Sequence, residues 1–125
     1  MTVVLDAGAL IAVERGDRRV AAMLAVANRA GVRITSCAPV VAQAWRSGAR
    51  QVRLARALAW VDVGLTDLEM AKRAGELLGA TATADVVDAF VALAVGDSDQ
   101  VWTSDPDDLR ALLNARGVRA GVIPV

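Results

Sequence analysis

Apolar residues along this chain follow two patterns that alternate with each other. Short runs rich in β-branched residues are typical of buried strands. These runs cover residues 2–6, 32–37 and 100–105, with weaker examples at 61–66 and 119–125. Between them lie longer segments in which apolar residues recur every three or four positions, the spacing of one helical face. These segments cover residues 7–16, 17–29, 38–48, 50–60, 66–79, 81–96 and 105–117.

The alternation of strands and helices predicts an α/β domain with a central, mostly parallel sheet flanked by helices. Residues that favour helix ends support several of the boundaries. Thr66 and Glu69 have the spacing of a capping box, so a helix is expected to begin there and to run to about Gly79. Pro39 and Pro106 fall in the first turns of predicted helices, where a residue without an N–H group is tolerated.

The length and composition predict one globular domain, residues 1–125. Hydrophobic residues make up 55% of the chain, which favours a packed core over disorder. The longest run without a charged residue, 34–45, is too short to cross a bilayer as a helix, and the first residues do not resemble a signal peptide. The single cysteine, Cys37, cannot form an internal disulfide. We therefore expect a cytoplasmic protein that does not interact with membranes.

The two halves of the chain carry opposite charges, although the formal net charge is zero. Residues 1–60 contain nine basic and three acidic side chains, a net of +6, and residues 61–125 contain five basic and eleven acidic ones, a net of −6. This split suits one surface for a polyanion and another for metal ions or a basic partner, although solvated helix faces explain it equally well. No histidine is present, which excludes Ser-His-Asp triads and histidine-ligated zinc.

Three aspartates occupy positions where an acid needs a special explanation. Asp6 and Asp105 each end a predicted strand, at the edge of a parallel sheet where ligands usually bind. Asp88 lies in the first turns of an otherwise apolar helix, where an acid has little value for packing. Asp85 and Asp108 share helix faces with Asp88 and Asp105. Taken singly, Asp85 and Asp105 are more simply explained as helix N-caps, and Asp6 as a turn residue.

Several carboxylates at one edge of a sheet repel each other unless cations neutralise them. Oxygen ligands without histidine or paired cysteines suit Mg²⁺ or Mn²⁺. Such an ion polarises a phosphate group and lowers the pKa of water, which is the chemistry of phosphodiester hydrolysis. The sequence therefore favours a Mg²⁺ or Mn²⁺ site, with Asp6 held at the end of a rigid strand.

Four short segments stand out along the chain: "VVLDAGALIA", "VVAQAWR", "DVVDAFVALA" and "VWTSD". In this order and at this spacing they resemble the PIN-domain ribonucleases, and the short chain resembles the VapC-type toxins of bacterial toxin–antitoxin pairs. The resemblance implies a PIN-like fold and a metal-dependent endoribonuclease toxin that hydrolyses RNA and so inhibits translation. It assigns metal ligation and catalysis to Asp6, Asp88 and Asp105, with Asp85 and Asp108 as accessory ligands acting through water.

The resemblance also implies partners for the chain. They are a cognate VapB-type antitoxin, whose C-terminal tail lies over the groove, and an RNA substrate. The small apolar surface of the first predicted helices suits a partner helix or a contact in a homodimer. One position departs from the family, because this chain has Gln43 where a glutamate is usual. An amide oxygen can ligate a hard cation but adds no negative charge. We therefore expect weaker metal binding, or a shift of that role to Asp85.

Basic and hydroxyl side chains are candidates for RNA binding. Arg46, Arg50 and Arg53 recur at helical spacing and can form a basic stripe, although a solvated helix face explains them equally well. Thr103 and Ser104 lie just before the last acid, where a hydroxyl can hold water or phosphate. Single-stranded RNA is the expected substrate, because a metal site at a sheet edge reaches an unpaired backbone more easily.

The three tryptophans, Trp45, Trp60 and Trp102, are able to stack on bases, but their apolar neighbours favour packing in the core or in an interface. The main alternative function is a PIN-like module that binds RNA or protein and is catalytically weak or inactive because of Gln43. A phosphoacceptor receiver domain is disfavoured, since it needs a lysine at a late strand end and the single lysine, Lys72, lies within a predicted helix.

Overall fold

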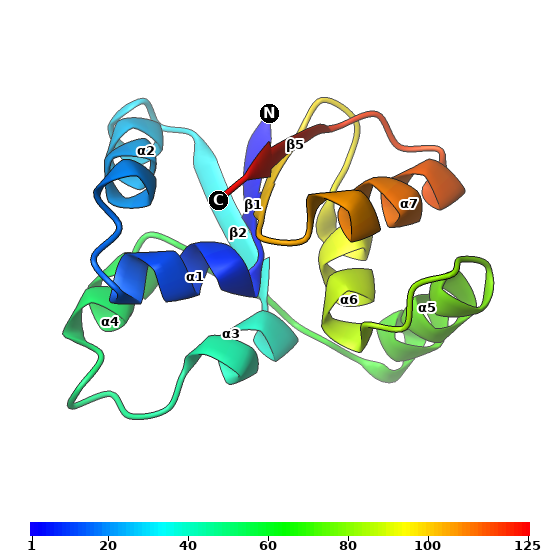
Figure 1. Cartoon of the computed structure of the whole chain (residues 1–125), viewed down its shortest axis with the longest axis horizontal. Coiled ribbons are helices and arrows are strands. Elements are labelled where there is room, and N and C mark those ends of the chain that lie inside the picture. The colour runs from blue at the N-terminus through cyan, green and yellow to red at the C-terminus, as the bar shows by residue number, and fades with distance from the viewer.

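Five parallel strands form the centre of the computed structural model, which describes residues 1–125 (Figure 1). They are β1 (Thr2–Leu5), β2 (Arg33–Cys37), β3 (Asp62–Gly64), β4 (Gln100–Thr103) and β5 (Gly121–Pro124). The order across the sheet is β3–β2–β1–β4–β5, and every neighbouring pair is parallel. The prediction of an α/β domain with a central sheet is confirmed, and the sheet is parallel throughout.

Seven helices surround the sheet. They are α1 (Ala7–Glu14), α2 (Arg18–Arg29), α3 (Ala38–Ala44), α4 (Val52–Leu58), α5 (Leu68–Gly79), α6 (Val86–Ala94) and α7 (Pro106–Arg116). In Figure 1, α1, α2 and α4 lie to the left of the strands, and α5, α6 and α7 lie to the right. The basic first half of the chain and its acidic second half therefore supply helices to opposite sides of the sheet. None of these helices combines the length and apolar character that a membrane span requires.

Helices on both sides of the sheet explain why the strands are almost continuously apolar in sequence. Val3, Val4 and Leu5 of the central strand β1 are all buried. Val4 pairs with Val101 of β4, and Leu5 pairs with the buried Trp102. These residues belong to a core cluster of 28 buried hydrophobic residues. The core therefore holds the end of β1, and with it the position of the next residue along the chain, in a fixed place.

The start of α5 differs from the prediction. The carboxylate of Asp67 accepts a hydrogen bond from the N–H of Met70 (2.9 Å), and the helix begins at Leu68. The predicted capping box at Thr66 and Glu69 is therefore wrong. Aspartate at the neighbouring position supplies the stronger of two adjacent caps.

The end of α3 also differs from the prediction, because the helix expected over residues 38–48 stops at Ala44. Nε2 of Gln51 donates to the carbonyl oxygen of Ala44 (2.9 Å). Oε1 of the same side chain accepts the N–H groups of Arg46 (2.6 Å) and Ser47 (2.9 Å). The side chain of Gln51 thus takes the place of the hydrogen bonds that a further helical turn would form.

The strand order reverses between β1 and β4. The chain runs from β1 outward to β2 and β3, and then crosses to β4 on the other side of β1. In an open parallel sheet, such a switch point leaves a crevice at the carboxyl ends of the two strands, where ligands bind. Asp6 directly follows β1, and Asp105 lies just beyond β4, so both acids are at this crevice.

Candidate metal centre

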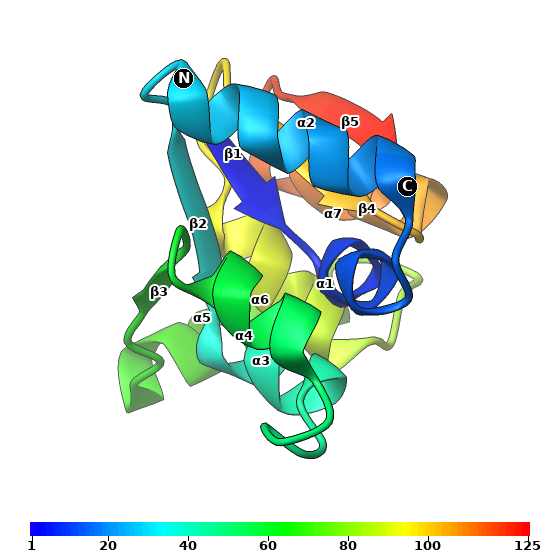
Figure 2. The same cartoon turned by 90° about the vertical axis from the view of Figure 1, so that its left-hand side faces the viewer.

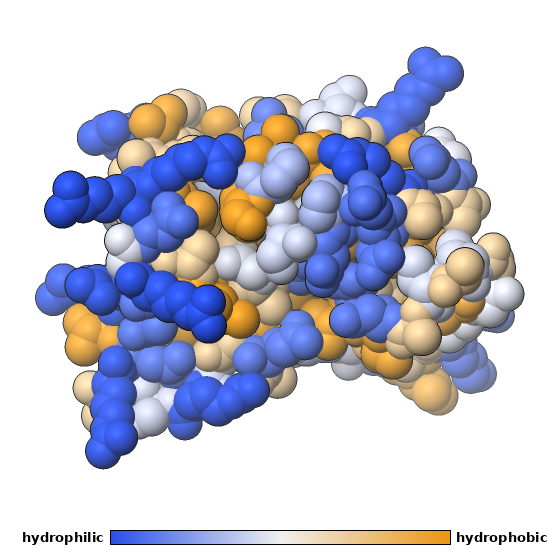
Figure 3. Space-filling view, in the orientation of Figure 1, coloured by the Kyte–Doolittle hydropathy of each residue, from blue (hydrophilic) through white to orange (hydrophobic).

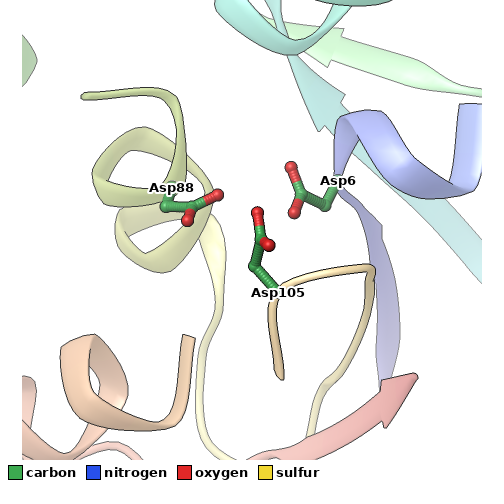
Figure 4. A group of neighbouring side chains, drawn as sticks. All are labelled: Asp6, Asp88 and Asp105. Carbon is green, nitrogen blue, oxygen red and sulfur yellow. The ribbon is translucent and has the colours of Figure 1, made fainter. Parts of the chain in front are cut away.

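Three carboxylates converge at the crevice between β1 and β4 (Figure 4). Asp6 precedes α1, Asp88 lies in the first turn of α6, and Asp105 precedes α7. One oxygen atom from each of the three lies within 4.8 Å of the others. The structure therefore brings together the three acids that the sequence assigned to metal ligation, and we call them the acidic cluster.

Asp6 is the most firmly held member of the acidic cluster. It is buried, and its Oδ1 accepts the N–H of Ala7 (2.6 Å) while its Oδ2 accepts the hydroxyl of Thr103 (2.6 Å). Burial raises the pKa of Asp6 above its ordinary value, although the hydrogen bonds from Thr103 and Ala7 act in the opposite direction. The negative charges of Asp105 and Asp85 add to the rise.

Asp88 is buried without adequate hydrogen bonding. Its side chain is 2% exposed, and its Oδ2 has no hydrogen-bond partner. Burial raises the pKa of Asp88 to about 8, and the surrounding negative charges contribute in the same direction, in the order Asp6, Asp85, Asp105 and Asp108. A buried carboxylate oxygen without a partner needs a proton or a cation to compensate it.

Asp105 is exposed and completes the acidic cluster from the solvent side. It stands at the N-cap position of α7, but its side chain forms no capping hydrogen bond. The cap explanation that the sequence allowed for Asp105 is therefore wrong, and its carboxylate is free to face the cluster. Its backbone N–H donates to the hydroxyl oxygen of Thr103 (2.9 Å).

Thr103 links two members of the acidic cluster, since its hydroxyl donates to Asp6 and accepts from the backbone of Asp105. The side chain is completely buried. The prediction that Thr103 binds RNA is therefore wrong, because its hydroxyl is used within the protein. Ser104 is exposed and stays a candidate for contact with a substrate.

The two accessory acids differ in their local roles. Asp85 is the N-cap of α6, and its carboxylate accepts the N–H of Asp88 (3.0 Å), so the N-cap explanation is confirmed for this residue. This cap also explains why α6 begins at Val86 and not near residue 81. Asp108 is exposed in the first turn of α7. Both lie outside the acidic cluster, but their charges raise the pKa of Asp88.

Gly8 allows α1 to approach the loop that carries Asp105. A Cβ atom at this position would lie 2.4 Å from Oγ of Ser104 and 2.9 Å from its backbone nitrogen. A glycine is therefore needed for this close approach. The role of Gly8 was not predicted from the sequence, although a glycine in the first turn of a helix is a recognisable signal of such a contact.

Gln43 lies in the last turn of α3, and the arginines of the predicted stripe follow it along the chain. Arg46 and Arg50 lie between α3 and α4, and Arg53 lies in the first turn of α4. Gln43 is exposed, forms no side-chain hydrogen bond, and lines a hollow of about 260 Å³ together with Arg46. Arg53 lines a different hollow, between α1, α2 and α4, and Arg50 lines neither. Because α3 ends at Ala44 and α4 begins at Val52, the three arginines do not share one helix face.

The tryptophans divide between the core and the surface. Trp102 is 3% exposed and packs in the core, as its apolar neighbours predicted. Trp45 and Trp60 are 37% and 46% exposed. Trp60 lines the hollow between α1, α2 and α4, where it is available to a partner.

No protein-family model matches this chain, and no curated protein matches it either. The resemblance to the PIN-domain ribonucleases therefore stays a prediction from sequence motifs.

The acidic cluster has the properties of a site that can hold a metal ion. Its donors are carboxylate oxygens that lie close together, and one of them, Oδ2 of Asp88, has no partner within the protein. Two of the three carboxylates are buried, which raises the free energy of their ionised forms unless a cation is bound. No histidine or second cysteine is available, so the donors are oxygens alone.

Proposed function

We propose that the protein is a metal-dependent endoribonuclease, a VapC-type toxin that hydrolyses phosphodiester bonds in RNA and so inhibits translation. The observation that carries this proposal is the convergence of Asp6, Asp88 and Asp105, with the partnerless Oδ2 of Asp88 among them. None of the three carboxylates forms an ion pair with a lysine or an arginine. Carboxylates that meet in this way at the carboxyl edge of a parallel sheet suit divalent-cation chemistry on phosphate.

The cation in this proposal is Mg²⁺ or Mn²⁺, because hard oxygen donors prefer these ions. Asp6, Asp88 and Asp105 are the residues that would hold it. When bound there, such an ion polarises a phosphate oxygen and lowers the pKa of a water molecule.

Each carboxylate has its own task in this proposal. Asp6 keeps one orientation, because Ala7 and Thr103 hold both of its oxygens. Asp88 provides the partnerless oxygen, and Asp85 holds its backbone in place. Asp105 is exposed, so it forms the side of the site that a substrate strand reaches first.

A second candidate function follows from Gln43, which stands where the family usually has a glutamate. With one negative charge fewer, the site would bind a cation more weakly, and the protein would act as a PIN-like module that binds RNA or protein. Metal titration and RNA cleavage, compared with RNA binding alone, distinguish the two functions.

The proposed inhibitor is a VapB-type antitoxin. The hollow between α1, α2 and α4 has a volume of about 390 Å³, and these helices face the viewer in Figure 2. Its apolar lining includes Val13, Leu24 and Trp60, and its rim carries three arginines, Arg18, Arg53 and Arg56. An amphipathic segment with acidic residues on its polar face fits both features.

The proposal also includes a homodimer and a cytoplasmic location. Leu65 and Leu68 are 91% and 72% exposed, and a second copy of the chain would cover such side chains. A cytoplasmic location follows from an RNA substrate involved in translation.

The decisive experiment incubates total cellular RNA with purified protein in Mg²⁺, in Mn²⁺ and in chelator, beside the variant Asp88→Asn. We expect discrete cuts that need the metal and disappear in the variant. Intact RNA under every condition, with the protein folded and free of antitoxin, would contradict the nuclease and favour the binding module.

A further inference from the structure

The exposed side of α1 leads away from the acidic cluster. It carries a stripe of residues at helical positions i, i+3, i+4 and i+7, namely Gly8, Ile11, Ala12 and Arg15. The stripe lines a hollow of about 380 Å³ that also includes Ser104, the residue before Asp105. Ile11 and Arg15 line the next hollow as well, which reaches Gln43 and Arg46. The two hollows thus meet at Ile11 and Arg15, and we call them together the α1 groove.

Two arginines give the α1 groove positive charge. Arg15 is exposed and forms neither an ion pair nor a side-chain hydrogen bond. Arg46 donates from Nη1 to the carbonyl oxygens of Ala42 (2.9 Å) and Trp45 (2.7 Å). These bonds hold the guanidinium of Arg46 in place, while its other nitrogens are free to bind a ligand.

The carboxylates that line the α1 groove are already engaged. Glu14 accepts the N–H of Leu54 (3.0 Å), and Asp17 accepts the N–H of Val20 (3.0 Å). Both bonds lie in the first turn of a helix, α4 or α2, where the positive helix end offsets a negative charge. The two guanidinium groups of the groove therefore have no ion-pair partner.

We propose that the α1 groove binds one arm of a single-stranded RNA substrate, with Arg15 and Arg46 holding its backbone phosphates. This inference rests on the proposed nuclease function. From Gly8 to Arg15 the helix rises by roughly 10 Å, which is about three steps of a stacked strand at about 3.4 Å per nucleotide. Arg15 therefore meets a phosphate two or three nucleotides from the bond that is cut.

Figure 3 shows how polar and apolar residues are distributed over the face of the molecule seen in Figure 1. In Figure 3, long hydrophilic side chains extend at the left, a second hydrophilic group lies right of centre, and less polar atoms separate them. A strand with one phosphate at the acidic cluster continues directly into the α1 groove, because the groove begins beside Ser104. Because the groove leads directly from the site of the proposed phosphodiester cleavage, RNA is the favoured occupant.

The test measures binding of a labelled single-stranded RNA to the full chain carrying Asp88→Asn, so that the RNA stays intact. Fluorescence anisotropy between about 50 and 200 mM salt gives both the affinity and its salt dependence. Adding Arg15→Gln is expected to weaken binding about tenfold and to reduce the slope of log K against log salt by about 0.7, the effect of one lost phosphate contact on a single strand.

Arg29→Gln is the matched control for Arg15→Gln. Arg29 is exposed at the last position of α2, forms no ion pair, and does not line the α1 groove. The substitution Arg29→Gln removes the same charge as Arg15→Gln, so it measures only the long-range electrostatic effect on RNA binding. We expect a loss of less than about twofold and an unchanged salt slope for this control.

A neutral methylphosphonate introduced at one position of the RNA at a time locates the contact. When Arg15 is present, a methylphosphonate two or three nucleotides from the cleavage site should lower the affinity for the RNA. In the Arg15→Gln variant, the same methylphosphonate should not lower the affinity further. This coupling between one phosphate and one arginine is not expected from a merely structural role of Arg15.

If Arg15→Gln and Arg29→Gln lower the affinity for RNA equally, the assignment of the α1 groove is wrong, while the nuclease proposal stays intact. If Arg15→Gln leaves RNA binding unchanged but weakens the binding of an acidic peptide, the groove belongs to a protein partner. That result would also overturn the assignment of the groove to RNA. If the unsubstituted chain neither binds nor cuts RNA, the proposed function fails, and the groove assignment fails with it.

Discussion

The two ends of the parallel sheet use aspartate in opposite ways. At the end where the strands begin, the half-buried Asp99 accepts the N–H groups of Thr2 (2.8 Å) and Gly96 (2.9 Å). At the end where the strands finish, Asp88 is more deeply buried, yet its Oδ2 accepts no hydrogen bond. The first acid therefore stabilises the fold, whereas the second destabilises it unless a proton or a cation is bound.

The largest expected effect is the difference in RNA cleavage between substitutions of Asp88 and Asp99. Asp88→Asn should lower metal-dependent RNA cleavage by at least about 100-fold, since it removes a charged ligand worth several kcal/mol of transition-state stabilisation. Asp99→Asn should keep the cleavage rate of the folded protein, but should lower the free energy of unfolding by about 1–3 kcal/mol, because it weakens two backbone contacts. Cleavage assays and urea unfolding measure the two effects.

Calorimetric titration with Mn²⁺ provides the control for this comparison. Asp99→Asn should bind the ion as the unsubstituted chain does, and Asp88→Asn should not bind it measurably. Full cleavage by Asp88→Asn would remove the assignment of the acidic cluster. Loss of Mn²⁺ binding in folded Asp99→Asn would show that the two ends of the sheet are not independent.

A second prediction concerns pH and the metal-free protein. The pKa of Asp88 is raised from 3.8 to about 8 in the folded state, so the folded protein holds a proton that the unfolded chain has lost. The free energy of unfolding therefore falls as pH rises from about 4 to about 8, by at most about 1.4 kcal/mol per pH unit from this group. The raised pKa of Asp6 acts in the same direction.

Urea unfolding in chelator, from pH 5 to pH 8, measures this dependence. Asp88→Asn serves as the control, because it cannot ionise and should have a flatter profile and a higher stability than the unsubstituted chain at pH 8. Mn²⁺ should restore stability most at high pH, since it binds the ionised carboxylates. Parallel profiles for the two proteins would contradict the prediction.

Local sequence patterns identified the members of the acidic cluster but not what holds them. Asp6 and Asp105 were predictable because the carboxyl ends of parallel strands meet at one edge, and Asp88 because an acid interrupts an apolar helix. The role of Thr103 was not predictable, since its partner Asp6 is brought to it only by the pairing of β1 with β4.

The ends of helices were also difficult to predict from local sequence patterns. Thr66 and Asp67 are adjacent residues that can each cap a helix, and the pattern alone does not choose between them. The early end of α3 depends on Gln51, which lies seven residues beyond Ala44 and forms a hydrogen bond that no helical periodicity encodes. Fold class follows from averages over many residues, whereas ends and contacts depend on single side chains.

A third prediction tests what holds the carboxyl end of the sheet in place. Thr103→Val removes the hydroxyl, which leaves Oδ2 of Asp6 without its donor and the N–H of Asp105 without its acceptor. We expect a loss of about 1–3 kcal/mol in the free energy of unfolding and about tenfold weaker Mn²⁺ binding. Urea unfolding and calorimetry measure the two quantities.

Ser36→Ala is the matched control for Thr103→Val. Ser36 is buried near the same end of the sheet and donates to the carbonyl oxygen of Leu5 (2.8 Å), not to a member of the acidic cluster. It should lower stability by about 1 kcal/mol without affecting Mn²⁺ binding. Similar Mn²⁺ affinities for the two variants would mean that Thr103 supports only the fold.

The smallest expected effect comes from two glutamines of the same hollow, Gln43 and Gln51. Gln43 forms no side-chain hydrogen bond, so Gln43→Glu adds a negative charge without breaking a contact. It should tighten Mn²⁺ binding roughly fivefold, the effect of about 1 kcal/mol for a unit negative charge about 8 Å from a divalent cation in water. The same charge lies in the α1 groove beside Arg46, so RNA binding should weaken while metal binding strengthens.

Gln51→Glu adds the same charge to the same hollow, but it removes the Nε2 donor to Ala44. We therefore expect it to lower the free energy of unfolding by about 1 kcal/mol and to leave Mn²⁺ affinity unchanged. Calorimetry on both variants decides where Gln43 belongs. Tighter Mn²⁺ binding for Gln43→Glu alone places residue 43 at the metal, whereas unchanged Mn²⁺ binding with weaker RNA binding makes it a residue of the α1 groove only.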